Sequence, residues 1–152
     1  MHTIRPWLYI GKFRETQDEE LLHQRGIGAI LQLADTVESP KIPSLYIPIE
    51  DGEPLPFDYL TRGVKFVRLE KARDRNLLIA CGAGISRSVS VAVAALKEEE
   101  NLTLFDAFRQ VLAKHPQARP HMALWKSLCE YYDEDLPYKD IFKLMRQQNT
   151  SS

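Results

Sequence analysis

LLIACGAGISRSVSVAVAAL, at residues 77–96, is the stretch that decides the fold of this chain. The apolar run at 77–80 predicts a short buried strand, and the apolar run at 89–96 predicts a buried helix. Between them lies a glycine-containing loop that carries the thiol of Cys81 and, six residues later, Arg87. The backbone N–H groups of such a loop and the positive end of the following helix together form a site for an anion.

The residue types in this loop favour a phosphate group as the anion. Arg87 can donate two N–H bonds to a tetrahedral oxyanion. The same positive field favours the thiolate over the thiol, which makes Cys81 a candidate nucleophile near neutral pH. The alternative is a structural cysteine with an unrelated surface arginine, because free cysteine often acts as a small core residue. The strand, glycine loop and helix in sequence favour the catalytic interpretation.

Composition predicts one domain over residues 1–152, with a short polar tail near 147–152. A chain of 152 residues with 44% hydrophobic content can bury a sizeable core. The net charge of −1 gives no basic field for nucleic acid or an anionic membrane. No apolar run is long enough for a membrane span, and because the first residues lack an apolar core we expect no secretion signal. Because the two cysteines fit a reducing compartment, we expect a cytoplasmic protein. We also expect it to be a monomer.

Hydrophobic patterning predicts strands and helices in the first part of the chain and helices alone afterwards. Thr16 and Thr103 are the predicted N-caps of two helices. This order predicts an α/β domain with a small central, mostly parallel sheet of about four to five strands, flanked by helices. The predicted strands are 7–10, 28–33, 45–49 and 77–80, and the predicted helices are 16–26, 57–67, 89–96, 104–112, 124–132 and 137–145.

The loop resembles the signature of the cysteine-dependent protein phosphatases, Cys-x5-Arg followed by Ser or Thr. Its sequence CGAGISRS is most similar to the dual-specificity phosphatase family. LYIG at 8–11, GI at 26–27 and IPIED at 47–51 resemble other segments of that family in the same order. The resemblance covers most of the chain and implies a dual-specificity phosphatase-like fold. It also implies hydrolysis of phosphotyrosine and of phosphoserine or phosphothreonine in proteins, through a cysteinyl-phosphate intermediate and without a cofactor.

The resemblance also implies a role for each residue of the loop. Cys81 is the expected nucleophile, and Ser88 occupies the position of a hydroxyl that stabilises the departing thiolate. Ser88 could instead cap the following helix. We expect inorganic phosphate or vanadate to bind in the same loop as the substrate. The expected phosphate-binding residues are Gly82, Ala83, Gly84, Ile85, Ser86 and Arg87.

Asp51 is the candidate general acid that gives a proton to the leaving oxygen. It follows a predicted strand, lies beside Gly52 and stands thirty residues before the nucleophile, as the acid of the family does. The alternative is an aspartate that stabilises a local turn, which is common next to glycine. Glu50 and Glu53 are the other candidates for the acid.

Ala80 is a departure from the family, which usually has His immediately before the nucleophile. We expect activity to survive, with a thiol at Cys81 that is harder to ionise or held less rigidly. Cys129 is expected to fill the core, a disulfide with Cys81 being the alternative. No metal site is expected, because the four histidines lack metal-ligand spacing.

Three other functions compete with protein dephosphorylation. A phosphate-binding module with little turnover is compatible with Ala80. A small soluble phosphate ester could be the substrate, because no docking segment is evident. A thiol reductase or sulfur transferase would need Cys129 as the partner of Cys81. The loop has no lysine to bind additional phosphates, which favours a monophosphorylated side chain over a phosphoinositide.

Overall fold

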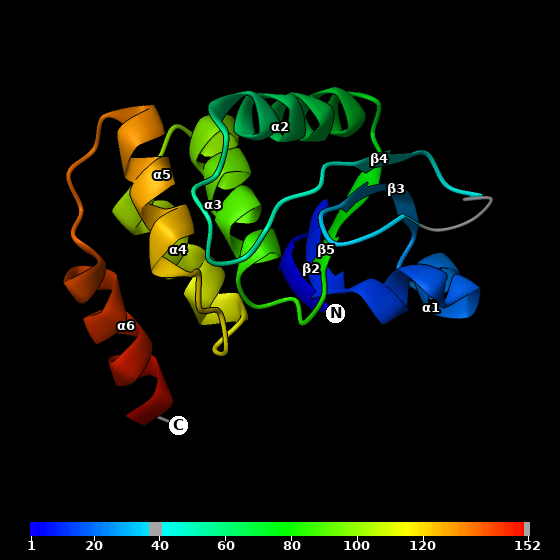
Figure 1. Ribbon diagram of the computed structural model, residues 1–152. Coiled ribbons are helices and arrows are strands. Elements are labelled where there is room, and N and C mark those ends of the chain that lie inside the picture. Colours follow the sequence, from blue (N-terminus) through cyan, green and yellow to red (C-terminus); the bar gives the residue numbers. More distant parts are fainter. Residues whose placement is uncertain (37–40, 151–152) are drawn as a thin grey trace.

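The computed structural model describes residues 1–36 and 41–150 and contains a mixed five-stranded sheet (Figure 1). The strand order is β1-β2-β5-β3-β4, in which β1 is antiparallel to β2 and all other neighbours are parallel. The predicted α/β class with a small, mostly parallel sheet is therefore confirmed. The strands are β1 (His2–Arg5), β2 (Leu8–Lys12), β3 (Ile27–Gln32), β4 (Ser44–Tyr46) and β5 (Asn76–Cys81).

Helices cover both faces of the sheet (Figure 1). On one face α2 and α3 contact the central strands, and α4 packs against α3 and β1. On the outside, α5 packs on α3, and α6 packs on α4 and α5. The short α1 covers the other face. No helix in the described ranges combines the length and apolar character needed to cross a bilayer. The helices are the 3-10 helix η1 (Phe13–Gln17), α1 (Glu19–Gln24), α2 (Phe57–Ala72), α3 (Arg87–Glu100), α4 (Leu104–Lys114), α5 (Met122–Tyr132) and α6 (Tyr138–Thr150).

Residues 77–96 form most of β5, the loop after it and most of α3, at the centre of the molecule. β5 pairs with β2 on one side and β3 on the other, so it is buried between two strands. Alternate side chains point to opposite faces of a strand. Cys81 accordingly belongs to the main core beneath α3, while Ala80 packs in a second apolar cluster with Leu22 of α1. The loop therefore starts from a rigid strand end.

Several local predictions differ from the structure. β1 was not predicted, because His2–Arg5 has a single buried apolar side chain, Ile4. The N-cap of α1 is Asp18, whose carboxylate accepts a bond from the Leu21 amide, and Thr16 lies in η1 instead. Asp and Thr are both good caps, so spacing alone did not separate them.

Other local predictions agree or are refined. Thr103 caps α4 as predicted, because its hydroxyl accepts from the Asp106 amide. β4 ends at Tyr46, before Pro48, and proline cannot donate to a strand ladder. The predicted polar tail is helical as far as Thr150, and Ser151 and Ser152 lie outside the described residues.

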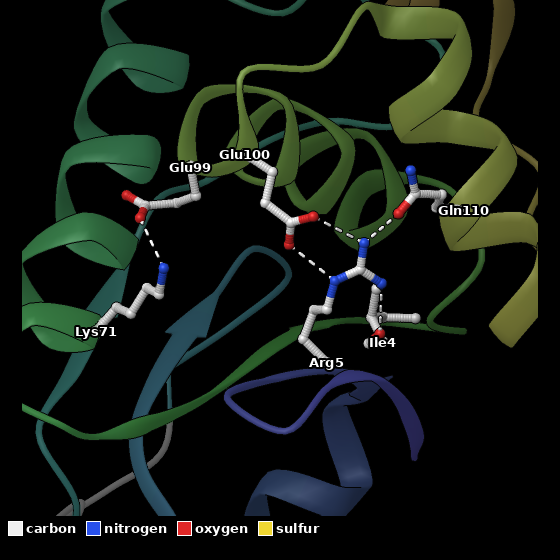
Figure 2. A network of polar contacts seen from close by, with 6 residues as sticks. All are labelled: Ile4, Arg5, Lys71, Glu99, Glu100 and Gln110. Carbon is white, nitrogen blue, oxygen red and sulfur yellow. Dashed lines mark hydrogen bonds and ion pairs between the residues drawn. The ribbon is translucent and has the colours of Figure 1, made fainter.

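A polar network anchors the edge strand β1 to the helices, as Figure 2 shows. The Arg5 guanidinium donates to both carboxylate oxygens of Glu100 at 2.8 and 2.9 Å, and also to the side chain of Gln110. Beside it, the Lys71 ammonium donates to Glu99 at 3.0 Å. The hydrogen bonds from Arg5 hold the pKa of Glu100 below its usual value. β1 is thus fixed to α3 and α4 at one edge of the sheet.

Candidate active site

A pocket of about 400 Å³ opens over the C-terminal end of β5. In open parallel sheets this end is where ligands bind. Of the four residues expected to be catalytic, the pocket is lined by Cys81, Arg87 and Asp51, and Ser88 lies buried behind Cys81. Asp51 comes from a different loop than Cys81 and Arg87. The lining residues are Asp51, Cys81, Ala83, Ile85, Ser86, Arg87, Arg119, His121, Met122 and Tyr138.

Cys81 lies at the base of the pocket and is 2% exposed. Its thiol donates to the hydroxyl of Ser88 at 3.2 Å, and the Ser88 amide donates to the sulfur at 3.4 Å. Ser88 is fully buried and lies within the first turn of α3, where its hydroxyl does not act as the cap. Both polar hydrogens of Ser88 can therefore be directed at the sulfur of Cys81.

The glycines of the loop allow close approach of the backbone. Gly84 has φ +73°, and a Cβ there would lie 2.8 Å from the Gly11 carbonyl oxygen of β2. A Cβ on Gly82 would lie 3.1 Å from a terminal nitrogen of Arg87. The Arg87 guanidinium also donates to the Ile49 carbonyl at 3.2 Å, which fixes it across the loop. One glycine thus allows the turn, and the other leaves room for the guanidinium.

Asp51 is the acidic candidate that lines the same pocket as Cys81. Glu50 lines an adjoining pocket, and Glu53 lines neither of these two. The Ser86 hydroxyl donates to the Asp51 Oδ1 atom at 2.5 Å. The His121 amide donates to the same hydroxyl at 2.9 Å. The loop that carries Asp51, the loop between Cys81 and Arg87, and the start of α5 therefore meet at Ser86.

Two residues that support the loop were not identified from the sequence. His115 is 1% exposed, and its Nε2 atom donates to the Gly84 carbonyl at 2.8 Å. Its ring stacks on His2 of β1 with centroids 3.7 Å apart, and burial lowers the pKa of His115. The Arg119 amide donates to the Ile85 carbonyl at 2.7 Å. No local pattern marks these contacts, because they join the loop to the segment between α4 and α5.

Three residues that form the rim of the pocket were also missed. Arg119 places its guanidinium over the Phe142 ring, 5.9 Å from the centroid. The Tyr138 hydroxyl donates to the Pro120 carbonyl at 2.8 Å, and burial raises the pKa of Tyr138. Met122 is 60% exposed at the start of α5. The rim therefore combines a cation with apolar surface.

Cys129 and Ala80 both lie away from the catalytic pocket. Both cysteines are free thiols. Cys129 is half-buried in α5, its thiol meets the Leu136 carbonyl at 3.5 Å, and burial raises its pKa. Ala80 is 1% exposed and packs beneath α1, on the opposite face of the sheet from Cys81. A larger residue at position 80 would meet apolar side chains there.

Comparisons with known proteins agree with this geometry. The family model described as the dual specificity phosphatase catalytic domain matches residues 8–134. Human dual specificity protein phosphatase 16 is 34% identical over 135 residues, which are 84% of this chain and 20% of that protein. Human dual specificity protein phosphatase 22 is 31% identical over 137 residues, which are 86% of this chain and 73% of that protein. The chain therefore spans about a fifth of phosphatase 16 and most of phosphatase 22.

Solved structures give the same assignment. The crystal structure of human DUSP28 is 25% identical with a TM-score of 0.80, and the match covers 88% of this chain and 96% of that one. A mouse dual specificity phosphatase complexed with zinc tungstate is 27% identical with a TM-score of 0.78, covering 86% of this chain and 84% of that one. With the family model matching from β2 to the end of α5, the chain belongs to the dual specificity phosphatase catalytic-domain family.

Proposed function

We propose that this chain is a protein phosphatase that hydrolyses phosphotyrosine, phosphoserine and phosphothreonine through a cysteinyl-phosphate intermediate. The observation that carries the proposal is the meeting of Cys81, Arg87 and Asp51 in one pocket, with Ser88 directed at the sulfur. Membership of the family supports the same reaction.

The first step transfers the phosphoryl group to the enzyme. The thiolate of Cys81 attacks phosphorus and forms the S–P bond, while the P–O bond to the side chain breaks. The electron pair of that bond goes to the leaving oxygen, which receives a proton from the Asp51 carboxyl group. Arg87 and the amides from Gly82 onward face the three equatorial oxygens and balance their charge.

The second step hydrolyses the intermediate. The Asp51 carboxylate now accepts a proton from a water molecule, whose oxygen attacks phosphorus. The S–P bond breaks, its electrons return to sulfur, and inorganic phosphate leaves. Ser88 would stabilise the thiolate, because its N–H and O–H groups both lie at the sulfur. Asp51 ends this step protonated, ready for the next substrate.

The pocket supports phosphorylated side chains as substrates. The exposed loop residues Ala83 and Ile85 are uncharged, so the loop offers a site for one phosphate group. Tungstate, present in the mouse relative, is a tetrahedral oxyanion like phosphate, which supports binding of phosphate or vanadate here. The proposal includes a single domain over residues 1–152, acting as a cytoplasmic monomer without a nucleic-acid or membrane partner.

The test is hydrolysis of an aryl phosphate with EDTA present, at mildly acidic to neutral pH. Turnover should vanish in Cys81→Ser and fall by about 10²- to 10⁴-fold in Asp51→Ala, the range for loss of a general acid. Cys129→Ser is the matched control and should keep full activity. Phosphotyrosine, phosphoserine and phosphothreonine peptides then test the substrate range. If the wild type binds vanadate without turnover, the chain is a phosphate-binding module and the proposal fails.

A further inference from the structure

A second pocket, here called the side pocket, adjoins the catalytic pocket between α5 and the start of α6. It has a volume of about 510 Å³ and shares His121, Met122 and Tyr138 with the catalytic pocket. His121 and Met122 lie at the start of α5, and Tyr138 is the first residue of α6. A substrate chain held in the catalytic pocket therefore lies beside the mouth of the side pocket.

Apolar atoms line most of the side pocket. Ala123 and Trp125 form the wall on α5, and Leu136 belongs to the opposite wall, in the segment that leads into α6. Two charged residues, Lys126 and Asp135, also line the pocket, and their charges are opposite in sign. Because the lining has no excess of either charge, the side pocket favours an uncharged, apolar occupant.

Hydrogen bonds hold the two walls of the side pocket in place. The Trp125 Nε1 atom donates to the Leu136 carbonyl at 2.9 Å, and the Cys129 thiol meets the same carbonyl at 3.5 Å. Two residues further on, the Tyr138 hydroxyl donates to the Pro120 carbonyl at 2.8 Å. The segment that leads into α6 is thus fixed to both ends of the neighbouring wall. A ligand meets a surface that is already formed, which reduces the entropy cost of binding.

Met122 lies at the boundary between the two pockets. It is 60% exposed, the largest exposed fraction of any large apolar side chain that the structure describes. Methionine is unbranched and flexible, so it adapts to apolar partners of different shapes. An apolar side chain in the side pocket would remove its own surface and that of Met122 from water, which stabilises the complex.

We infer that the side pocket binds a large apolar side chain of the substrate, one or two positions away from the phosphorylated residue; this inference rests on the proposed phosphatase function. The occupant comes from the substrate itself, because a phosphorylated side chain at Cys81 holds the rest of that chain next to the shared rim residues. Leucine and phenylalanine have the required chemistry. Aspartate, glutamate, lysine and arginine would lose hydration there without a compensating partner.

Paired phosphotyrosine peptides test this preference. In each pair an alanine near the phosphotyrosine is replaced by leucine, at each position in turn on both sides. At the favoured position, leucine should raise kcat/KM about fivefold or more. Ala123→Glu puts a charge among the apolar side chains and should reduce the preference below about twofold. No leucine preference in the wild type, or an unchanged preference in Ala123→Glu, would overturn the inference.

Leu69→Glu is the matched control for the added charge. Leu69 is 46% exposed on α2 and lines neither the catalytic pocket nor the side pocket. Ala123→Glu should fold, because an acidic residue in the first turn of α5 interacts favourably with the helix dipole. The two peptides of a pair carry equal charge, so their ratio cancels general repulsion of phosphate by the new carboxylate. Loss of the leucine preference in Leu69→Glu as well would contradict the inference.

Cys129 provides a measure of occupancy that needs no turnover. It lines the side pocket, and the chain has only two cysteines, so in Cys81→Ser protein a thiol reagent reports on Cys129 alone. Because burial raises the pKa of Cys129, its reaction with N-ethylmaleimide is measured at mildly alkaline pH. A saturating phosphotyrosine peptide with leucine at the favoured position should slow this reaction severalfold. The alanine peptide and the unphosphorylated leucine peptide should not slow it.

These measurements separate the side pocket from the proposed function. If the leucine phosphopeptide protects Cys129 while the wild type shows no turnover, the side pocket stands and the phosphatase proposal falls. If the wild type turns over without leucine preference or protection, the side pocket inference falls alone. Equal protection by the unphosphorylated peptide would overturn the inference, because binding would then be independent of the catalytic pocket. Protection that needs only a higher protein concentration would also overturn it, since a second copy of the chain would fill the pocket.

Discussion

The loop between Cys81 and Arg87, here called the phosphate loop, is built differently on its two sides. On the pocket side, the side chains of Asp51, Ser86 and Arg87 present polar atoms to a ligand. On the opposite side, the Gly84 carbonyl accepts from buried His115, and Gly84 presses against the backbone of β2. The pocket side consists of polar side-chain contacts that the fold does not depend on, whereas the supporting side consists of closely packed backbone. Substitutions on the first should change activity, and substitutions on the second should change stability.

The largest effect is expected from Arg87→Lys, on the pocket side. Lysine keeps the positive charge but cannot donate two parallel bonds to an oxyanion. A lysine ammonium also cannot lie against Gly82 and donate to the Ile49 carbonyl at the same time, as the Arg87 guanidinium does. We expect kcat/KM for an aryl phosphate to fall by about 10²- to 10³-fold, with the midpoint of thermal unfolding nearly unchanged. Arg62→Lys on the exposed face of α2 is the control. A large loss of stability would show that the two sides are not separable.

On the supporting side, Gly84→Ala should mainly destabilise the fold. The new Cβ would lie 2.8 Å from the Gly11 carbonyl oxygen, at a backbone φ of +73° that alanine rarely adopts. Strain and a steric clash together should lower the free energy of unfolding by about 2–4 kcal/mol, measured by urea denaturation. Gly82→Ala, whose Cβ meets only the flexible Arg87 side chain, should cost less. Similar losses for both variants would contradict this assignment of the supporting side.

The sequence predicts the pocket side far better than the supporting side. Cys81, Arg87 and Ser88 lie within one strand-loop-helix segment, so their spacing already places them together. Asp51 could be identified because it follows a predicted strand beside a glycine and because its place thirty residues before Cys81 resembles that of the acid of the family. The roles of these residues in the reaction stay predictions until variants are measured.

The supporting side depends on contacts between distant segments. His115 meets Gly84, and His2 of the unpredicted β1 stacks on it; neither contact follows a periodic pattern. The overall fold was predictable because hydrophobic periodicity marks strands and helices directly. Caps and edge strands were less so, since several residue types serve as caps and β1 has little apolar character.

Ala80→His tests the departure from the family pattern next to the nucleophile. The imidazole would enter the apolar cluster around Leu22 and Leu78, where an unpaired polar group should lower the free energy of unfolding by about 1–3 kcal/mol. At the same time we expect faster alkylation of Cys81 by iodoacetamide at neutral pH, and altered turnover. Ala80→Leu is the control, which adds volume without a polar group. Unchanged turnover in Ala80→His would show that position 80 does not influence the thiol.

The smallest effect is a pH dependence of stability that arises on the supporting side. Burial, followed by the adjacent His115 and further neighbouring charges, lowers the pKa of His2 from 6.5 to about 4, and burial also lowers the pKa of His115. The unfolded chain therefore binds protons at a higher pH than the folded chain. By linkage, this contribution to stability is present above pH 6.5 and is lost as the pH falls from 6.5 toward about 4.

His2→Phe should reduce this pH dependence while preserving the ring stack on His115. Lys12 and the N-terminal ammonium also face His2, and the Glu15 carboxylate partly offsets them. Because Glu15 and Glu100 have pKa values below their usual 4.5, their protonation destabilises the fold at still lower pH, so the upper half of the window reports the histidines. Urea unfolding at a series of pH values measures the slope, with exposed His23→Phe as the control. An unchanged slope in His2→Phe would mean that the stack does not couple protonation to the loop.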